Sequence, residues 1–521
     1  MEETMRDKIK KLEEKRIHLQ QGGGPKAVER QHGLGKLTAR ERISRLLDPG
    51  SFIELDLWAA AKKAGYDIDE RELAADGVVT GYGMVGNRPV CIYAQDFTVL
   101  AGTLGTTHAK KIIKILQRAL KMEVPLIGII DSGGVRVQDH VTANPHDGYS
   151  SMFYYHTISS GVIPQLALMM GPCAAGAAYS PILHDLVFMV KNTSYMYIAS
   201  PVLVKTVTSE VITDQELGGA EMHAKISGCC DILTDNDKDC LEQAKRLLSF
   251  LPLNHKQKPP RLETGDDPNR RDEELLEIVP LNPRAPFDMH KIIRHVVDRG
   301  DFFEIKKDFA KNMIVGLARL NGNPVGVVAN NPAHIAGSLD INGADKEARF
   351  IRFCDCFNIP LVFFVDTPAY LPGKAQEHGG IIRHGAKVLY AISESTVPKV
   401  TVYIRKAYGG ANPAMCNEPM GSDLVLAWPT AEAALMGAEG AVAIIYGKAI
   451  ATAENPAEMK AKKIQEYLSQ FGEQPYHAAA CMRLEEIIDP RETRPLLIKA
   501  LVIMEHKEEC RKPKKHGNIP L

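Results

Sequence analysis

Two turns of small residues are the segments of this sequence best suited to chemistry. RKAYGGANPAM (405–415) and GPCAAGAAYSP (171–181) each contain the end of an apolar run and the start of an expected helix. Where a helix begins just after a buried strand, its first backbone N–H groups have no partner within the helix, and the helix dipole favours negative charge there. Small residues let a ligand oxygen approach those N–H groups closely. Each turn could therefore stabilise an oxyanion, and two turns indicate two developing oxyanions; the alternative is a duplicated turn that serves packing alone.

Catalysis by side chains has less support in the sequence. It contains no G-x-S-x-G elbow, H-E-x-x-H helix, Walker A loop or dinucleotide fingerprint. Asp131 and Asp366 end expected strands and could act as bases, but we expect each to hold the loop that follows it. Candidate acid–base histidines, for each of which a surface or structural role is expected first, are His140, His146, His156, His378 and His384.

The two turns belong to an internal repeat. NRPVCIYAQDFTVLAGTL (87–104) matches GNPVGVVANNPAHIAGSL (322–339) at an offset of 235 residues, and Asp131 falls opposite Asp366 at the same offset. Beyond those aspartates the offset becomes 234, and Gly176 then falls opposite Gly410. The repeat bears on the fold class, because two segments with matching sequence patterns are expected to form the same structural unit.

Each half of the repeat indicates the same α/β unit. It consists of a buried strand, an amphipathic helix, a buried strand ending in Asp, a glycine-containing loop, a helix, and a third buried strand leading into the turn. This order indicates parallel βαβ units, whose ligands bind at the carboxyl ends of the strands. We expect an N-terminal domain over residues 1–255, a proline-rich and charged linker over 256–274, and a C-terminal domain over 275–521.

Composition excludes several functional classes. The 521 residues suffice for two domains, and a formal net charge of −1 gives no whole-chain electrostatic basis for binding nucleic acid. The ten cysteines are scattered without metal-finger spacing. No apolar run approaches the roughly 20 residues that span a bilayer. We therefore expect reduced thiols, no bound metal and a cytoplasmic location.

Longer motifs accompany the turns along the chain. They include HGLGKLTARERI (32–43), DGVVTGYG (76–83), AQDFTV (94–99), DSGG-x-R (131–136), SGVIPQ (160–165), ELGGA (216–220), FCD-x-FNIPLV (353–362), GGIIRHGAK (379–387) and AWPTAE (427–432). Together with the turns, these motifs resemble the carboxyltransferase subunit of biotin-dependent acyl-CoA carboxylases. That family includes the propionyl-CoA carboxylase β chain, the methylmalonyl-CoA decarboxylase α chain and the transcarboxylase large subunit. The resemblance covers essentially the whole chain.

The resemblance implies two tandem crotonase-like domains. The N-terminal half would hold the acyl-CoA, and the C-terminal half of a second subunit would hold biotin, in a hexamer built as a dimer of trimers. The N–H groups of Ala175 and Gly176 would stabilise the thioester enolate, and those of Gly410 and Ala411 the biotin ureido oxygen. The family register could differ by one residue, because the repeat pairs Gly176 with Gly410.

Further binding residues follow from the same resemblance. The acyl side would include Gly133, Gly134 and Val135, and the other side Asn412 and Pro413. Carboxybiotin would release CO2, its ureido nitrogen would take the α-proton of propionyl-CoA or a related thioester, and the enolate would attack the CO2. No protein base is then required.

The chain departs from the family around the expected pocket. Val135 replaces an alanine, Ala175 replaces a glycine, TPAY (367–370) replaces VPGF, and Pro413 stands at the acyl-selecting position. Either an acyl group other than propionyl or neutral drift would account for these changes. Lys36 and Arg40 are the only suggestions for the CoA phosphates.

The chain has no ATP site and no biotin attachment signal, so a separate biotin carboxyl carrier protein is expected. Its other partner would be a biotin carboxylase subunit or, if the chain is the α subunit of a sodium-pumping decarboxylase, a membrane subunit. Two alternative hypotheses for the function remain. The first is a crotonase-type hydratase or isomerase, which needs one such domain and paired acids, and the second is a non-catalytic CoA-binding scaffold. Turnover without biotin would favour the former, and CoA binding without exchange the latter.

Overall fold

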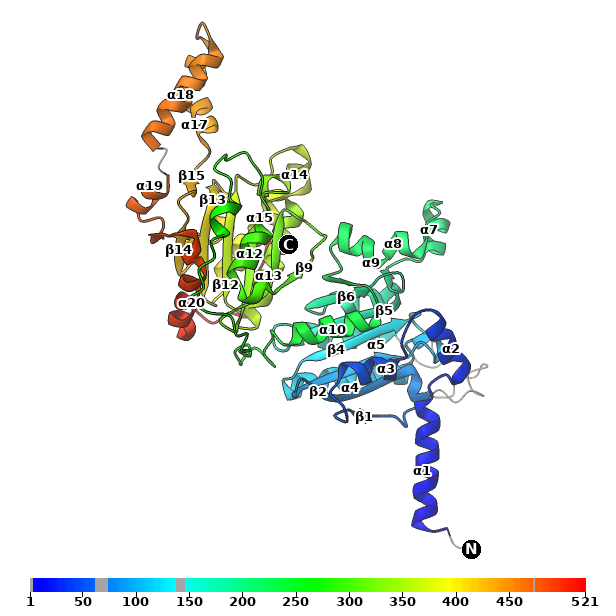
Figure 1. Ribbon diagram of the computed structural model, residues 1–521. Helices are drawn as coiled ribbons and strands as arrows, with labels where there is room; N and C mark the ends of the chain where they lie inside the picture. The colour runs from blue at the N-terminus through cyan, green and yellow to red at the C-terminus, as the bar shows by residue number, and fades with distance from the viewer. Residues whose placement is uncertain (1–2, 61–73, 137–145, 472–473) are drawn as a thin grey trace. The chain divides into compact units, whose positions relative to one another are not determined.

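The structure is a computed structural model that describes residues 3–60, 74–136, 146–471 and 474–521 (Figure 1). The chain forms two compact units, Met1–Lys258 and Pro259–Leu521. The division falls within the stretch 256–274, and most of that stretch belongs to the second unit. Each unit is organised around its own sheet.

The first unit contains an eight-stranded sheet whose central strands are parallel. The order is β1-β2-β3-β4-β5-β6-β8, and β7 pairs with the end of β5. The strands β1 to β3 pair antiparallel, and the pairs from β3 onward are parallel. The strands are β1 (Ile53–Leu55), β2 (Val78–Val85), β3 (Arg88–Gln95), β4 (Leu126–Ser132), β5 (Gln165–Ala174), β6 (Leu186–Val190), β7 (Tyr195–Tyr197) and β8 (Ile232–Thr234).

The second unit repeats this topology. Its order is β9-β10-β11-β12-β13-β14-β16, and β15 pairs with the end of β13. Each strand therefore has a counterpart in the first unit, and the repeat predicted from the sequence is confirmed. The strands are β9 (Phe302–Ile305), β10 (Met313–Leu320), β11 (Asn323–Asn330), β12 (Leu361–Thr367), β13 (Lys399–Tyr408), β14 (Leu424–Ala427), β15 (Glu432–Ala434) and β16 (Glu486–Ile487).

Helices pack on both sheets and bury their apolar faces. In the first unit α4 packs on β2 and β3, and α10 on β5 and β6. The helices there are α1 (Met5–Gln20), α2 (Pro25–Gly33), α3 (Ala39–Leu46), α4 (Thr106–Met122), α5 (His146–Ser159), α6 (Tyr179–Ile182), α7 (Pro201–Thr208), α8 (Asp214–Gly218), α9 (Ala220–Met222) and α10 (Asp237–Leu248). Because the parallel strands are covered, β4 is buried at every residue, which explains its unbroken apolar run.

In the second unit α13 packs against α15 beside the sheet, and α17 packs with α18 (Figure 1). The helices there are α11 (Leu275–Ile278), α12 (Met289–Val296), α13 (Ile341–Cys356), α14 (Lys374–Gly379), α15 (Ile381–Glu394), α16 (Ala411–Ala414), α17 (Ala438–Ala451), α18 (Pro456–Phe471), α19 (Gln474–Ala480) and α20 (Thr493–Ile503). The helix α1 of the first unit buries none of its residues.

The aspartates near the ends of β4 and β12 are structural anchors. Asp131 is fully buried and accepts hydrogen bonds from Lys36 Nζ (2.7 Å) and Arg42 Nη1 (2.8 Å). Asp366 is buried and paired with Arg405 (2.9 Å). The prediction that each holds the following loop is therefore inexact. Asp131 instead fastens the segment before β1 to the sheet, and Asp366 fastens β12 to β13.

Removing Asp131 should destabilise the first unit strongly. Asp131→Ala leaves Lys36 and Arg42 buried without their shared carboxylate, so we expect a loss of about 3–5 kcal/mol in the free energy of unfolding, measured by urea denaturation. Asp235→Ala is the control, because its pair with Lys191 has a carboxylate side chain that is 71% exposed; it should cost less than about 1 kcal/mol. Equal losses in the two variants would contradict the anchor role.

Candidate functional site

The first turn lies between β5 and α6. β5 ends at Ala174, and Ala175–Ala178 form one turn of 3-10 helix that continues into α6. Ala175 has a φ of +58°, in the left-handed region. This residue redirects the chain from strand to helix, so the N–H groups that follow it belong to the first turn of a helix. Such groups have no acceptor within their own helix.

The second turn has the same construction. β13 ends at Tyr408, Gly409 has a φ of +52°, and α16 begins at Ala411. The N–H of Gly409 donates to Ala434 O (3.1 Å), and that of Asn412 donates back to Gly409 O (3.3 Å). The two amides between these, at Gly410 and Ala411, are therefore the pair best placed to donate to a ligand.

Backbone conformation fixes how the two turns correspond. Ala175 and Gly409 are the left-handed residues, so Gly176 corresponds to Gly410 and Ala177 to Ala411. The predicted donors of the two turns, Ala175 and Gly176 in the first and Gly410 and Ala411 in the second, therefore do not correspond. The first pair lies one residue too early. The offset of 234 also pairs Ala177 with Ala411, so the repeat contains the signal that could have identified Ala177 as a donor.

The loop after β4 lies beside the first turn. Gly134 has a φ of +102°, and a Cβ built on it would lie 3.7 Å from Ala174 O. Gly133 N–H donates to Ala101 O (2.8 Å), and Val135 forms a parallel bridge with Leu104. The structure therefore brings the predicted residues 133–135 to the end of β5. Residues 133–135 thus form one wall of the first turn. Tyr149 adds to this wall, because its Cδ2 lies 3.9 Å from where a Cβ on Gly176 would lie.

The second turn has a different wall. Tyr370 bridges Leu339 as Val135 bridges Leu104, so Tyr370 is the counterpart of Val135. Its Cδ2 lies 3.9 Å from where a Cβ on Gly410 would lie. Asn412 Oδ1 accepts a hydrogen bond from Tyr403 OH (2.9 Å), and Pro413 is half-buried within α16. The phenol of Tyr370 in the second unit thus corresponds to the isopropyl side chain of Val135 in the first.

His156 is held in a buried network beneath the first turn. Its Nδ1 lies 2.8 Å from Gln165 Oε1, and its Nε2 lies 3.0 Å from Ser180 Oγ. The Gln165 oxygen can only accept, so Nδ1 carries the proton and Nε2 accepts from the serine. Burial lowers the pKa of His156 to about 4. The neutral ring therefore orients α6 through Ser180 and is not placed to act as an acid at neutral pH.

The other histidines show no common arrangement. His384 Nδ1 lies 2.8 Å from Asp345 Oδ2, and His378 is exposed. His146 begins α5, and His140 lies outside the described residues. The positions of His378 and His384 agree with the surface and structural roles that were expected first.

Lys36 and Arg40 are both engaged within the first unit. Lys36 is 4% exposed and is paired with Asp131, and Arg40 binds Glu54 through both terminal nitrogens (2.7 and 2.8 Å). Because each side chain already holds a carboxylate, both residues are poor ligands for the CoA phosphates in this arrangement.

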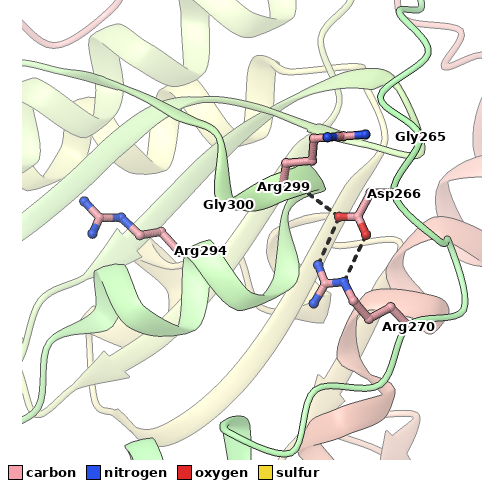
Figure 2. A pocket seen from close by; sticks show the side chains of 6 residues that line it. All are labelled: Gly265, Asp266, Arg270, Arg294, Arg299 and Gly300. Carbon is pink, nitrogen blue, oxygen red and sulfur yellow. Dashed lines mark hydrogen bonds and ion pairs between the residues drawn. The ribbon is translucent and has the colours of Figure 1, made fainter.

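A separate cavity of about 480 Å³ lies in the second unit (Figure 2). Gly265, Asp266, Arg270, Arg294, Arg299 and Gly300 line it. Figure 2 shows Asp266 between the Arg270 guanidinium (3.0 and 3.1 Å) and the Arg299 backbone N–H (2.8 Å), with the Arg294 side chain directed away. Asp298 beside it accepts from Gly322 in the β10–β11 hairpin, at the amino ends of the parallel strands. The turns after β5 and β13 lie at the opposite, carboxyl ends of the strands. This cavity is therefore separate from them, and we assign its ion pairs a structural role.

Metal clusters and membrane-spanning helices are both absent from the described ranges. Within them, His, Cys, Asp and Glu side chains nowhere gather in threes that could ligate a metal. No helix in the same ranges is both long enough and apolar enough to cross a membrane.

Comparison with known proteins decides the family. The model of the carboxyl transferase domain matches residues 30–519. The chain belongs to the carboxyl transferase family. It is 49% identical to methylmalonyl-CoA decarboxylase subunit alpha of Veillonella parvula, over 99% of this chain and 100% of the relative. It is 48% identical to the propionyl-CoA carboxylase carboxyltransferase subunit of Haloferax mediterranei, over 99% and 100%.

Solved structures agree with this assignment. Transcarboxylase 12S, solved with methylmalonyl-coenzyme A and methylmalonic acid bound and described as a hexamer, matches with a TM-score of 0.96 and 45% identity, over 100% of this chain and 99% of the other. The two units are tandem crotonase-like domains, as expected from the motifs. The expected enzyme class, an acyl-CoA carboxyltransferase, is also confirmed.

Ala175 offers a direct test of the register of the turn. Its φ of +58° disfavours a side chain, so Ala175→Gly should raise the free energy of unfolding by up to about 1 kcal/mol. Gly409→Ala places a side chain at the corresponding φ of +52° and brings its Cβ to 3.1 Å from Leu435 O, so it should lower the free energy of unfolding by at least a similar amount. Thermal denaturation would measure both changes. A loss of stability in Ala175→Gly would show that the residue does not occupy this conformation.

His156 should make the first unit sensitive to acid. Its pKa is lowered from the ordinary 6.5 to about 4 in the folded protein, so between these values the unfolded chain binds the proton first. The contribution of His156 to the free energy of unfolding is therefore fully present above about pH 6.5. It falls as the pH drops toward 4, by at most about 1.4 kcal/mol per pH unit. Urea midpoints should therefore depend less on pH in His156→Gln than in the wild type. The exposed His378→Gln should keep the wild-type dependence, and an unchanged dependence in His156→Gln would contradict the assignment.

Proposed function

We propose that this chain transfers a carboxyl group between carboxybiotin on a separate carrier protein and the α-carbon of an acyl-CoA, with propionyl-CoA and methylmalonyl-CoA as its substrate pair. One observation supports this most directly: two turns of the same backbone conformation end corresponding strands of tandem domains. A reaction between two partners, each passing through an oxyanion, needs two such sites. The first turn would serve the acyl-CoA in the domain of residues 1–255, and the second would serve biotin in that of 275–521.

The first turn would act on the thioester. The N–H groups of Gly176 and Ala177 would donate to the thioester oxygen as it becomes an enolate, which is worth roughly 3 kcal/mol for each well-aimed donor. Gly133, Gly134 and Val135 would line the acyl group together with Tyr149. Ala175 carries a methyl group where the family has glycine, and this change removes neither N–H.

The second turn would act on the biotin ureido oxygen through Gly410 and Ala411. Asn412 and Pro413 follow these donors, and Tyr370 walls the turn from the β12 side. Carboxybiotin supplies the carboxyl group and, once this has left, a ureido nitrogen that can take the α-proton. The protein's part is then to bind, orient and stabilise charge, which agrees with the structural engagement of His156, Asp131 and Asp366.

The named relatives support the substrate class. They include subunits of a propionyl-CoA carboxylase and of methylmalonyl-CoA decarboxylases at nearly equal identity. The proposal therefore covers transfer in either direction, with the direction set by the partner: a biotin carboxylase subunit or a membrane decarboxylase subunit. The hexamer described for transcarboxylase 12S supports a homo-oligomer of the same kind for this chain.

Gly410 allows the second turn to be tested with a matched pair of variants. Its φ of −67° suits proline, so Gly410→Pro removes one N–H with little change in backbone angle. We expect kcat for biotin-dependent decarboxylation of methylmalonyl-CoA to fall about 10²- to 10³-fold. Gly410→Ala keeps the N–H, and its Cβ would meet Tyr370 at an ordinary 3.9 Å. This control should stay within about threefold of the wild type. Equal losses in both variants would mean that the N–H is not the functional group.

A further inference from the structure

Tyr403 and Asn412 form a hydrogen bond that joins β13 to α16 beside the second turn. Tyr403 is 1% exposed, and its hydroxyl donates to Asn412 Oδ1 over 2.9 Å. Burial raises the pKa of the Tyr403 phenol, so the phenol keeps its proton. Asn412 is the one partner of this hydroxyl among the described residues, and a buried hydroxyl needs an acceptor for its proton. The carboxamide of Asn412 is therefore held with its oxygen toward Tyr403.

This orientation leaves the amide group of Asn412 available at the second turn. Asn412 is the second residue of α16 and directly follows Ala411, one of the two proposed donors. Side chains of a helix lean toward its N-terminal end, which is the end that carries those donors. No described residue accepts a hydrogen bond from Asn412 Nδ2, and this atom is not among the buried polar atoms that lack a partner, so it is accessible. The second turn therefore has a third N–H group, on a side chain, that can donate to a ligand.

The repeat shows that the fold does not require this hydrogen bond. In the register of the neighbouring strands, Met169 of β5 is the counterpart of Tyr403. Ala178 stands two residues after the turn glycine of the first unit, as Asn412 does in the second, so Ala178 is the counterpart of Asn412. Both counterparts are buried and apolar. The same strand and helix start thus meet through hydrocarbon in one unit and through a phenol and an amide in the other.

We propose that Asn412 is a further donor to the ligand of the second turn and that Tyr403 is the positioning residue that orients it. The backbone N–H groups of Gly410 and Ala411 and the side-chain amide of Asn412 then converge on one acceptor oxygen. This inference rests on the proposed function, in which the ligand is biotin and the acceptor is its ureido oxygen. It explains why a buried phenol and an amide stand at the second turn, where the first unit packs well without either.

The test separates the two substrates kinetically. Decarboxylation of methylmalonyl-CoA would give kcat/KM for free biotin and KM for the thioester in wild type, Asn412→Leu, Tyr403→Phe and the double variant. Asn412→Leu keeps the approximate size of the side chain and removes its amide, so we expect kcat/KM for biotin to fall about tenfold, with KM for the thioester unchanged. Tyr403→Phe leaves the amide in place but no longer orients it, so we expect a fall of about threefold to tenfold.

The pair should also behave as one unit. Because Tyr403 acts only through Asn412, the double variant should lose no more than Asn412→Leu alone. Thr401→Val is the matched control. It removes a buried hydroxyl from the same face of β13, and that hydroxyl donates to Cys416 O (2.6 Å) instead of to Asn412. This control should lower the melting temperature and leave kcat/KM for biotin unchanged.

Each part of the inference has a result that would overturn it. An unchanged kcat/KM for biotin in Asn412→Leu would exclude the donor, and an unchanged value in Tyr403→Phe or additive losses in the double variant would exclude the positioning role. A rise in KM for the thioester, or a loss in Thr401→Val as large as in Tyr403→Phe, would show general damage to the unit and also overturn the inference. If Asn412→Leu does not fold, Tyr403→Phe and Thr401→Val decide by the same comparison. A wild type without biotin-dependent turnover would instead refute the proposed function and, with it, this inference.

Discussion

Both candidate sites depend on one backbone constraint: a single residue in the left-handed region between a buried strand and a helix. Ala175 and Gly409 hold this conformation at φ values of +58° and +52°. An L-residue there costs about 1–2 kcal/mol, and the surrounding structure sustains it because β5 and β13 are fixed in the middle of their sheets. The amides that follow lie at a helix start, where they have no acceptor within the helix and can donate to a ligand.

The repeat separates what the fold needs from what each half does with it. Both halves keep the strand order, the left-handed residue, the buried aspartate and the buried lysine of the covering helix, which is Lys111 in α4 and Lys346 in α13. The residues beside the turns differ: Val135 in the first unit is apolar, and its counterpart Tyr370 in the second unit carries a hydroxyl group. A duplicated scaffold can thus present the same pair of donors to two chemically different partners, because the donors belong to the backbone and selectivity belongs to the walls.

Much of this arrangement could be predicted from the sequence. The repeat, the parallel βαβ units and the two turns follow from apolar runs and glycines that are local in the chain. The register of the first turn could not be fixed by composition, because Ala175 carries no sign of its positive φ, and only its pairing with Gly409 reveals it. The partners of Asp131 were also missed, since Lys36 and Arg42 lie about 90 residues away in the sequence and meet it only in the folded unit.

If the two turns serve two partners, one of which is biotin, decarboxylation of methylmalonyl-CoA by the purified protein must depend on biotin. The rate would be measured with and without free biotin. We expect turnover that requires biotin and saturates with both biotin and the thioester. Turnover at the same rate without biotin would refute a role for biotin and favour a crotonase-type reaction at the first turn alone.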